Sequence, residues 1–216
     1  MQALMDTRAQ GLAVDSCGQV QKLGPWDAVV VPDAVMTCDR HWLGVYVHTA
    51  CAQFHVPPGV RVVENRPAGG CADGLHVVLE DICVVISVHG AARSEPLWPQ
   101  HRRLLIDEIA AAGGALSAVS GVGGERICAV LPAQEIIAAG VDGPRWMVRA
   151  VAYGRDFVGR DVHGLLDELL ADFVVFRGPG PVGPGMPLDM TVLASPFRHV
   201  TTPFSGVIEN SQARLI

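Results

Sequence analysis

The sequence is poor in charged residues and contains almost no lysine. Charged residues make up 18% of its 216 residues, hydrophobic residues make up 50%, and the formal net charge is −6. This composition excludes a disordered chain, which combines low hydrophobicity with high charge, and it provides no general attraction toward the phosphate backbone of a nucleic acid. Lys22 is the one lysine among 16 basic residues. The arginine excess reflects either genome composition or selection for bidentate anion binding.

The sequence also lacks a segment long and apolar enough to cross a membrane. Its most apolar run, 75–88, contains His76, Glu80 and Asp81 and is shorter than the ~20 residues that a spanning helix needs. Residues 1–20 do not combine a cationic start with an apolar block, so no secretory signal peptide is predicted. We therefore expect a cytoplasmic protein that does not insert into membranes.

Motifs typical of enzymes and cofactor-binding proteins are missing as well. The six cysteines include no Cys-x-x-Cys pair, which argues against a zinc finger or a thioredoxin-like motif. Ser120 and Ser205 lack the Gly-x-Ser-x-Gly elbow of serine hydrolases. The glycine-rich segment 121–126 is followed by a predicted strand, whereas a phosphate-binding loop is followed by a helix. We expect no catalytic residue and no cofactor, and the sequence favours a non-enzymatic protein.

Three histidines, His41, His48 and His55, raise the question of a metal site because they are seven residues apart. This spacing separates side chains by ~23 Å along an extended strand, whereas zinc ligands usually come in close pairs. A turn at 50–53 would bring His48 near His55, with Cys51 between them. We interpret the three as unrelated histidines and predict no metal.

Composition divides the chain into a leader, a domain and an extension. Residues 1–22 show no strong periodicity and predict a loose leader. Residues 23–178 contain no linker, repeat or low-complexity block, which favours a single domain. Residues 179–216 begin in a proline- and glycine-rich run that cannot sustain a helix or a central strand. We expect this extension to form an extended strap that is either pinned to the surface or mobile.

The hydrophobic pattern predicts a sheet of short strands and two helices. Helical spacing and Pro99 predict a helix at 98–112, and Asp161 is a suitable N-cap for a helix at 162–171. Glu80-Asp81 predicts either a hairpin turn or a bend within a single strand. Short turns join most strands, so we predict an α+β fold with a mainly antiparallel sheet, two helices packed on one face and a Pro/Gly-rich C-terminal strap. The predicted strands are 43–48, 59–64, 75–79, 82–88, 115–120, 126–131, 135–141, 145–153 and 173–177.

The segment 141–149 places two arginines and a tryptophan on a predicted strand. In a strand, Arg145 and Arg149 share one face and Trp146 lies on the other, and Arg177 closes the last predicted strand. We predict a ligand-binding site formed by Arg145, Arg149, Arg177 and Trp146, in which the guanidinium groups bind a carboxylate or a phosphate bidentately. The alternative is that these arginines form ordinary surface ion pairs with neighbouring carboxylates.

Five short segments follow one another along the chain: Gly24-Pro25-Trp26-Asp27, Ala91-Ala92-Arg93-Ser94, Gly143-Pro144-Arg145-Trp146, Val174-Val175-Phe176-Arg177-Gly178 and Met186-Pro187-Leu188. In this order they resemble an uncharacterised actinobacterial family, domain of unknown function 3710, over residues 23–193. The resemblance implies a bacterial protein. It implies no reaction, cofactor or catalytic residue, and it therefore assigns no role to any residue of this chain.

We predict a non-enzymatic protein-binding or assembly module, adaptor- or chaperone-like, that forms a homo-oligomer or binds another protein. The basis is the absence of convergent titratable groups, together with an apolar sheet whose uncovered face would meet a partner. The alternative is a protein or enzyme that uses the arginine cluster for a small anionic ligand, with Asp142 or His163 as acid or base. Nucleic acid is not an expected partner, because the chain is acidic.

Overall fold

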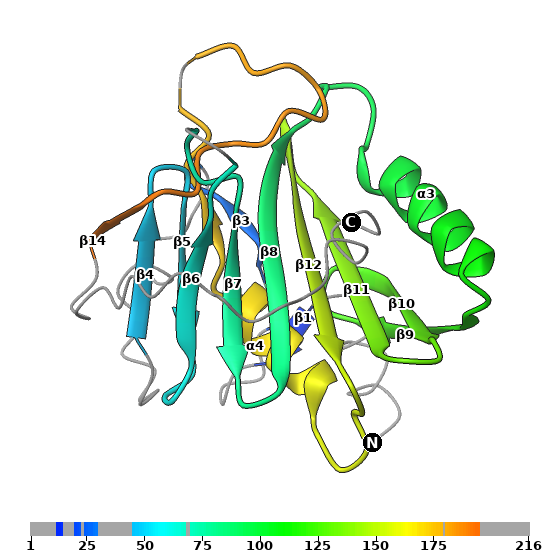
Figure 1. The fold of residues 1–216 in the computed structure, drawn as a ribbon. Helices are drawn as coiled ribbons and strands as arrows, with labels where there is room; N and C mark the ends of the chain where they lie inside the picture. Colours follow the sequence, from blue (N-terminus) through cyan, green and yellow to red (C-terminus); the bar gives the residue numbers. More distant parts are fainter. Residues whose placement is uncertain are drawn as a thin grey trace.

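The computed structural model describes residues 12–14, 20–22, 24–29, 45–67, 70–178 and 180–194. In this part of the chain the strands form a seven-stranded sheet, a five-stranded sheet and a two-stranded hairpin, accompanied by two helices (Figure 1). The hairpin consists of β1 (Leu12–Val14) and β2 (Val20–Lys22), within the segment predicted as a loose leader. Residues 1–11 and 15–19 of that leader, and residues 179 and 195–216 of the extension, lie outside the described residues.

The larger sheet is antiparallel throughout. In sheet order its strands are β6 (Arg61–Asn65), β7 (Gly74–Leu79), β8 (Ile82–Gly90), β12 (Trp146–Gly154), β11 (Glu135–Asp142), β10 (Gly124–Val130) and β9 (Ala115–Gly121). Most neighbours are joined by short hairpins, as the sequence pattern predicted, because a tight turn returns the chain in the antiparallel direction. The central pair, β8 and β12, joins strands that a helix and three strands separate along the chain.

The turn between β7 and β8 is a two-residue hairpin loop, which decides between the two alternatives for Glu80-Asp81. Leu79 and Ile82 face each other across the ladder. Glu80 has a φ of 53°, the left-handed conformation that such loops require and that glycine or asparagine usually supplies. Arg160 donates to Glu80, and its Nη2 lies 3.1 Å from Asp81 Oδ1. The turn signal was weak in the sequence because a glutamate occupies this position.

The smaller sheet contains strands that the sequence pattern did not predict. In sheet order its strands are β14 (Val192–Ala194), β4 (Val45–Thr49), β5 (Ala52–Val56), β13 (Val174–Val175) and β3 (Trp26–Asp27); β13 and β3 are parallel and the other pairs antiparallel. The turn before β5, Ala50-Cys51, has no glycine, proline, asparagine or aspartate. The Thr49 hydroxyl closes it, accepting from the Ala52 amide at 2.8 Å and donating to the Ala52 carbonyl at 3.0 Å.

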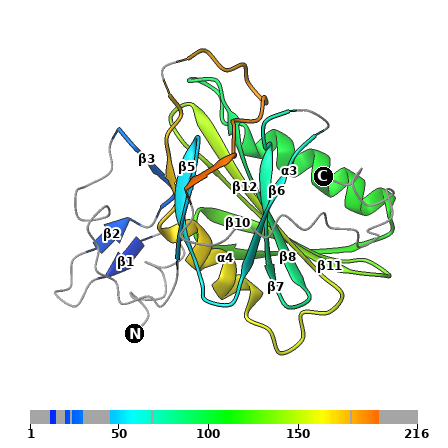
Figure 2. The same ribbon diagram turned by 60° about the vertical axis from the view of Figure 1, so that its left-hand side comes forward.

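The two helices cover opposite faces of the larger sheet, whereas we expected both on one face. The helix α4 (Val162–Ala171) lies between the two sheets, and α3 (Trp98–Ala111) lies on the other side of the larger sheet (Figure 2). The α+β class with a mainly antiparallel sheet and two helices is confirmed. The helices are split because Met147 and Val148 of β12 point to opposite sides and are both fully buried. Neither helix of the described chain is long and apolar enough to span a membrane.

The main core fills the space between the two sheets and α4. It contains Phe54 of the smaller sheet, Ile86 of the larger sheet and Leu166 of α4, all fully buried. A second core lies between the larger sheet and α3. Here the helix approaches β11 at Gly140, where a Cβ atom would lie 2.1 Å from the ring of Trp98. The close packing of α3 therefore depends on a glycine in the strand beneath it.

The described part of the C-terminal extension, 180–194, is pinned to the larger sheet, and we call it the strap. The Leu188 amide donates to the Val88 carbonyl at 2.8 Å, and the Met190 amide donates to the Ala72 carbonyl at 2.7 Å. The side chains of Leu188 and Met190 are buried in the main core. In Figure 1 the strap arches over one end of the larger sheet before it enters β14.

Asp142 at the end of β11 caps α3 from a distant part of the chain. Its carboxylate accepts the amide hydrogens of Leu97 at 2.8 Å and of Trp98 at 3.1 Å. The residue at the N-cap position, Leu97, has no side chain that could do so. Since the first amides of a helix have no partner within the helix, the tertiary contact supplies the missing acceptor.

Asp142→Ala is expected to lower the free energy of unfolding by about 1–2 kcal/mol, the usual loss when a helix cap is removed. Asp142→Asn keeps one side-chain oxygen and is expected to lower it less. Urea denaturation followed by circular dichroism measures both changes. Asp107→Ala, on the exposed side of α3, removes the same charge and is expected to stay within about 0.5 kcal/mol of wild type. Equal losses for Asp142→Ala and Asp107→Ala would contradict the capping role.

Candidate functional sites

A surface pocket at one end of the larger sheet brings together three arginines from distant segments. Arg93 follows β8, Arg145 precedes β12, and Arg177 follows β13. The pocket has a volume of about 470 Å³, and two residues of the strap contribute to its wall. We call it the arginine pocket; its lining residues are Ala91, Ala92, Arg93, Arg145, Arg177, Val182 and Pro184.

Main-chain hydrogen bonds hold the segments around the arginine pocket in place. The Ala91 amide donates to the Arg145 carbonyl at 2.9 Å and so extends the pairing of β8 with β12. The Phe176 amide donates to the Cys51 carbonyl at 2.6 Å, which fixes the segment of the third arginine to the smaller sheet. Gly90 makes two further main-chain hydrogen bonds with the strap, at 2.9 and 2.8 Å. The pocket is therefore built on a rigid frame.

The arginines of the pocket have no anionic partner in the part of the chain that the structure describes. Arg93, Arg145 and Arg177 form no ion pair there, and no carboxylate is among the lining residues. Arg177 Nη2 lies 3.5 Å from the Val182 carbonyl oxygen, and the buried Nε of Arg177 has no hydrogen-bond partner among the described residues. Because arginine keeps its charge at every physiological pH, three positive charges face one pocket.

The structure separates the four residues of the predicted ligand site. Arg145 and Arg177 meet in the arginine pocket. Arg149 lies farther along β12, half-buried on the face that α3 partly covers, and burial lowers its pKa. Trp146 points to the opposite face and is fully buried, where its indole N–H donates to Asp27 at 2.9 Å. Trp146 therefore anchors the start of β12 and does not line the pocket.

Arg93 is the pocket residue that the sequence reasoning missed. Its segment, Ala91-Ala92-Arg93-Ser94, is one of those that carry the family resemblance. No strand register connects it with Arg145 or Arg177, however, because it lies in the irregular stretch between β8 and α3. Only the tertiary arrangement places the three guanidinium groups around one pocket.

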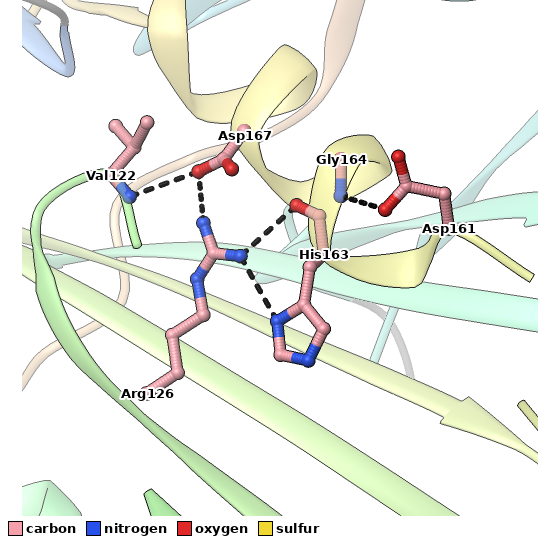
Figure 3. A network of polar contacts seen from close by, with 6 residues as sticks. All are labelled: Val122, Arg126, Asp161, His163, Gly164 and Asp167. Atoms are coloured by element: carbon pink, nitrogen blue, oxygen red, sulfur yellow. Dashed lines mark hydrogen bonds and ion pairs between the residues drawn. The ribbon is translucent and has the colours of Figure 1, made fainter. Parts of the chain in front are cut away.

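The two residues considered as acid or base have structural partners outside the pocket. Asp142 caps α3. His163 lies beside the buried Arg126, which donates to the His163 carbonyl at 3.0 Å and to the Asp167 carboxylate (Figure 3). Asp167 also accepts the Val122 amide at 2.9 Å. This network ties the β9–β10 hairpin to α4.

The histidines and cysteines of the described residues are not grouped for metal binding. No three His, Cys, Asp or Glu side chains lie close enough to hold an ion in this part of the chain. His48 is exposed, and His55 stacks on Tyr46 with ring centroids 3.9 Å apart; His41 lies outside the described residues. Burial raises the pKa of Cys51 to about 12, so this thiol stays protonated and unreactive at neutral pH.

A second candidate site is the open edge of the larger sheet at β9, which we call the β9 edge. The strand reads Ala-Leu-Ser-Ala-Val-Ser-Gly and has neither a charged residue nor a proline. Its residues 115–120 are all exposed, and Leu116 and Val119 keep 40% and 42% of their surface accessible. The opposite edge, β6, carries Arg61 and Glu64, which is one way in which proteins prevent edge pairing. One edge of the sheet is thus protected, and the other is open to a further strand.

The fold and its sites define a two-sheet α+β protein with an arginine-lined pocket and an unprotected sheet edge. A sequence model of the family described as "Protein of unknown function (DUF3710)" matches residues 24–197. Since the match spans most of the chain, the protein belongs to this family, as the resemblance in its sequence indicated. None of the curated proteins matches the chain.

His89 lies next to the strap and is neutral in the folded protein. Its Nε2 is 2.9 Å from Ser87 Oγ and its Nδ1 is 3.3 Å from the Gly185 carbonyl oxygen. Burial, with Arg149 nearby, lowers the pKa of His89 to about 4. Burial also lowers the pKa values of His55, His76, His101 and His163. In the unfolded chain these histidines return to the usual value of about 6.5.

The free energy of unfolding is therefore expected to fall as the pH drops from about 7 to about 4.5, because the unfolded chain binds protons that the folded protein does not. Stability from these groups is complete above the unfolded pKa and is lost as the pH falls through the folded values. His89→Gln is expected to make this decline shallower, because it removes the group whose pKa burial lowers to about 4. Urea unfolding at several pH values measures the slopes. An unchanged slope in His89→Gln would contradict the assignment.

Proposed function

We propose that the protein is a non-enzymatic assembly module that forms a homo-oligomer by pairing its β9 edge with the β9 edge of a second copy. The observation that supports this function is the β9 edge itself, which is exposed and uncharged along residues 115–120. An unpaired edge strand presents a row of free amide and carbonyl groups. A strand added there satisfies these groups, which is the physical basis of β-strand addition between proteins.

The side-chain pattern of β9 suits pairing with itself around a two-fold axis. An antiparallel pair centred on Ala118 places Ser117 opposite Val119 of the partner subunit and Leu116 opposite Ser120 of the partner subunit. Each large side chain then faces a small one, and no like charges meet across the pair. The two larger sheets become one continuous sheet across the axis.

The β9 edge is held in position before any partner arrives. β9 pairs with β10 along its whole length, from Ala115 to Gly121. Gly123 in the turn and Gly124 at the start of β10 have φ values of 82° and 123°, which only glycine adopts readily. The contact of Arg126 with Asp167 fixes the same hairpin to α4. Because the edge is already ordered, association loses little conformational freedom.

The thiols and the net charge of the chain bear on the setting in which the module acts. We place it in the cytoplasm, where the free thiols of Cys51, Cys71, Cys83 and Cys128 suit a reducing environment. Nucleic acid is not proposed as a partner, because the net charge of −6 opposes binding to phosphate backbones. An adaptor role, in which a strand of another protein occupies the same edge, follows the same chemistry.

Val119→Lys is expected to convert the oligomer into a monomer, because it places two lysines diagonally across the axis and they repel each other. Analytical ultracentrifugation of the full chain measures the change. Val158→Lys introduces the same charge at an 83% exposed position outside the β9 edge and is expected to sediment like wild type. A wild-type protein that is monomeric at all concentrations would refute self-assembly.

The register can be tested separately by cross-linking. Ala118→Cys places two thiols opposite each other at the axis, within the distance that a disulfide spans, and mild oxidation should yield a covalent dimer. Ala115→Cys places its thiol opposite Gly121 of the partner subunit and should yield no more dimer than the native cysteines do. Non-reducing gel electrophoresis distinguishes the two, and equal yields would exclude a pair centred on Ala118.

A further inference from the structure

The arginine pocket concentrates positive charge in a protein that has more acidic than basic residues. The chain contains 22 acidic and 16 basic residues, so carboxylates are plentiful. Four other arginines of the described chain form ion pairs with carboxylates, namely Arg66–Glu64, Arg102–Glu125, Arg126–Asp167 and Arg160–Glu80. The three pocket arginines differ, because their segments are fixed around a pocket that has no carboxylate in its lining.

We propose that the arginine pocket binds a small phosphate monoester, independently of assembly at the β9 edge. A phosphate monoester has three terminal oxygens and a charge of about −1.5 to −2 at pH 7. A carboxylate has two oxygens and is satisfied by a single bidentate arginine. Three guanidinium groups, each with several donors in a planar fork, match the tetrahedral dianion better than the smaller monoanion.

The size and walls of the pocket define the rest of the ligand. A volume of about 470 Å³ is in the range of small-molecule sites. The uncharged part of the lining is aliphatic and consists of Ala91, Ala92, Val182 and Pro184. No aromatic side chain is among the lining residues, so a nucleobase would find no stacking partner there. The organic part of the ligand is therefore small and aliphatic.

Main-chain hydrogen bonds hold the segments from which the arginines enter the pocket. The Arg145 carbonyl is held by the Ala91 amide at 2.9 Å, and Trp146 is anchored on Asp27 behind it. Replacing a guanidinium group should therefore leave the frame of the pocket intact. The same rigidity favours binding, because preorganised donors lose little entropy when the ligand arrives.

Isothermal titration calorimetry of the full chain with inorganic phosphate and with glycerol phosphate tests the proposal. We expect saturable binding of both phosphates. At equal ionic strength the affinity for acetate is expected to be at least about tenfold lower, because each lost charge-assisted hydrogen bond lowers the affinity by that order. Arg93→Gln, Arg145→Gln and Arg177→Gln are each expected to weaken phosphate binding at least about tenfold. Arg177→Lys keeps the charge without the planar fork and is expected to lie between Arg177→Gln and wild type.

Two variants serve as controls. Arg155→Gln removes an equal charge at an exposed position outside the pocket and should bind phosphate like wild type. Val119→Lys should also bind like wild type, so that a failure of assembly and a failure of phosphate binding remain distinguishable. Circular dichroism verifies that each variant is folded. The proposal is overturned by folded wild-type protein that does not bind phosphate, by acetate binding as tightly, or by equal weakening in Arg155→Gln and Arg145→Gln.

Discussion

The burial of both faces of β12 is the constraint on which the rest of the structure depends. This strand lies in the middle of the larger sheet, between β8 and β11, and its residues Trp146, Met147 and Val148 are all buried. An apolar strand of this kind is unstable unless both of its faces are removed from water. The smaller sheet and α4 cover one face, and α3 covers the other. The need to cover both faces accounts for the second sheet, which together with α4 covers the face opposite to α3.

The same constraint positions the two candidate sites. The start of β12 meets the end of β8 and the strap at one end of the larger sheet, and the arginine pocket forms where these segments converge. The β9 edge lies three strands away from β12 in the sheet order. The β9 edge departs from the rules that a stable monomer follows, because it leaves an edge of the sheet unprotected. Departures of this kind are typical of functional sites.

Several titratable groups that look reactive in the sequence serve the fold in the structure. The Asp142 carboxylate accepts two amides at the start of α3, and Asp167 neutralises the buried Arg126. Burial holds Cys51 in its thiol form. The role of such a group is set by its partner and its burial, and neither can be read from its residue type alone.

The sequence by itself determined the elements that depend on neighbouring residues. The helices at 98–111 and 162–171, the cap at Asp161 and most strands of the larger sheet follow from local hydrophobic periodicity and turn residues. The sequence pattern did not predict β5, because the side-chain hydroxyl of Thr49 closes the turn before this strand in place of a typical turn residue. Only the tertiary structure decided that the helices lie on opposite faces and that Arg93 joins Arg145, while Arg149 is kept apart. These features bring together segments that are distant along the chain. The relative positions of such segments are set by long-range packing, which local sequence patterns do not encode.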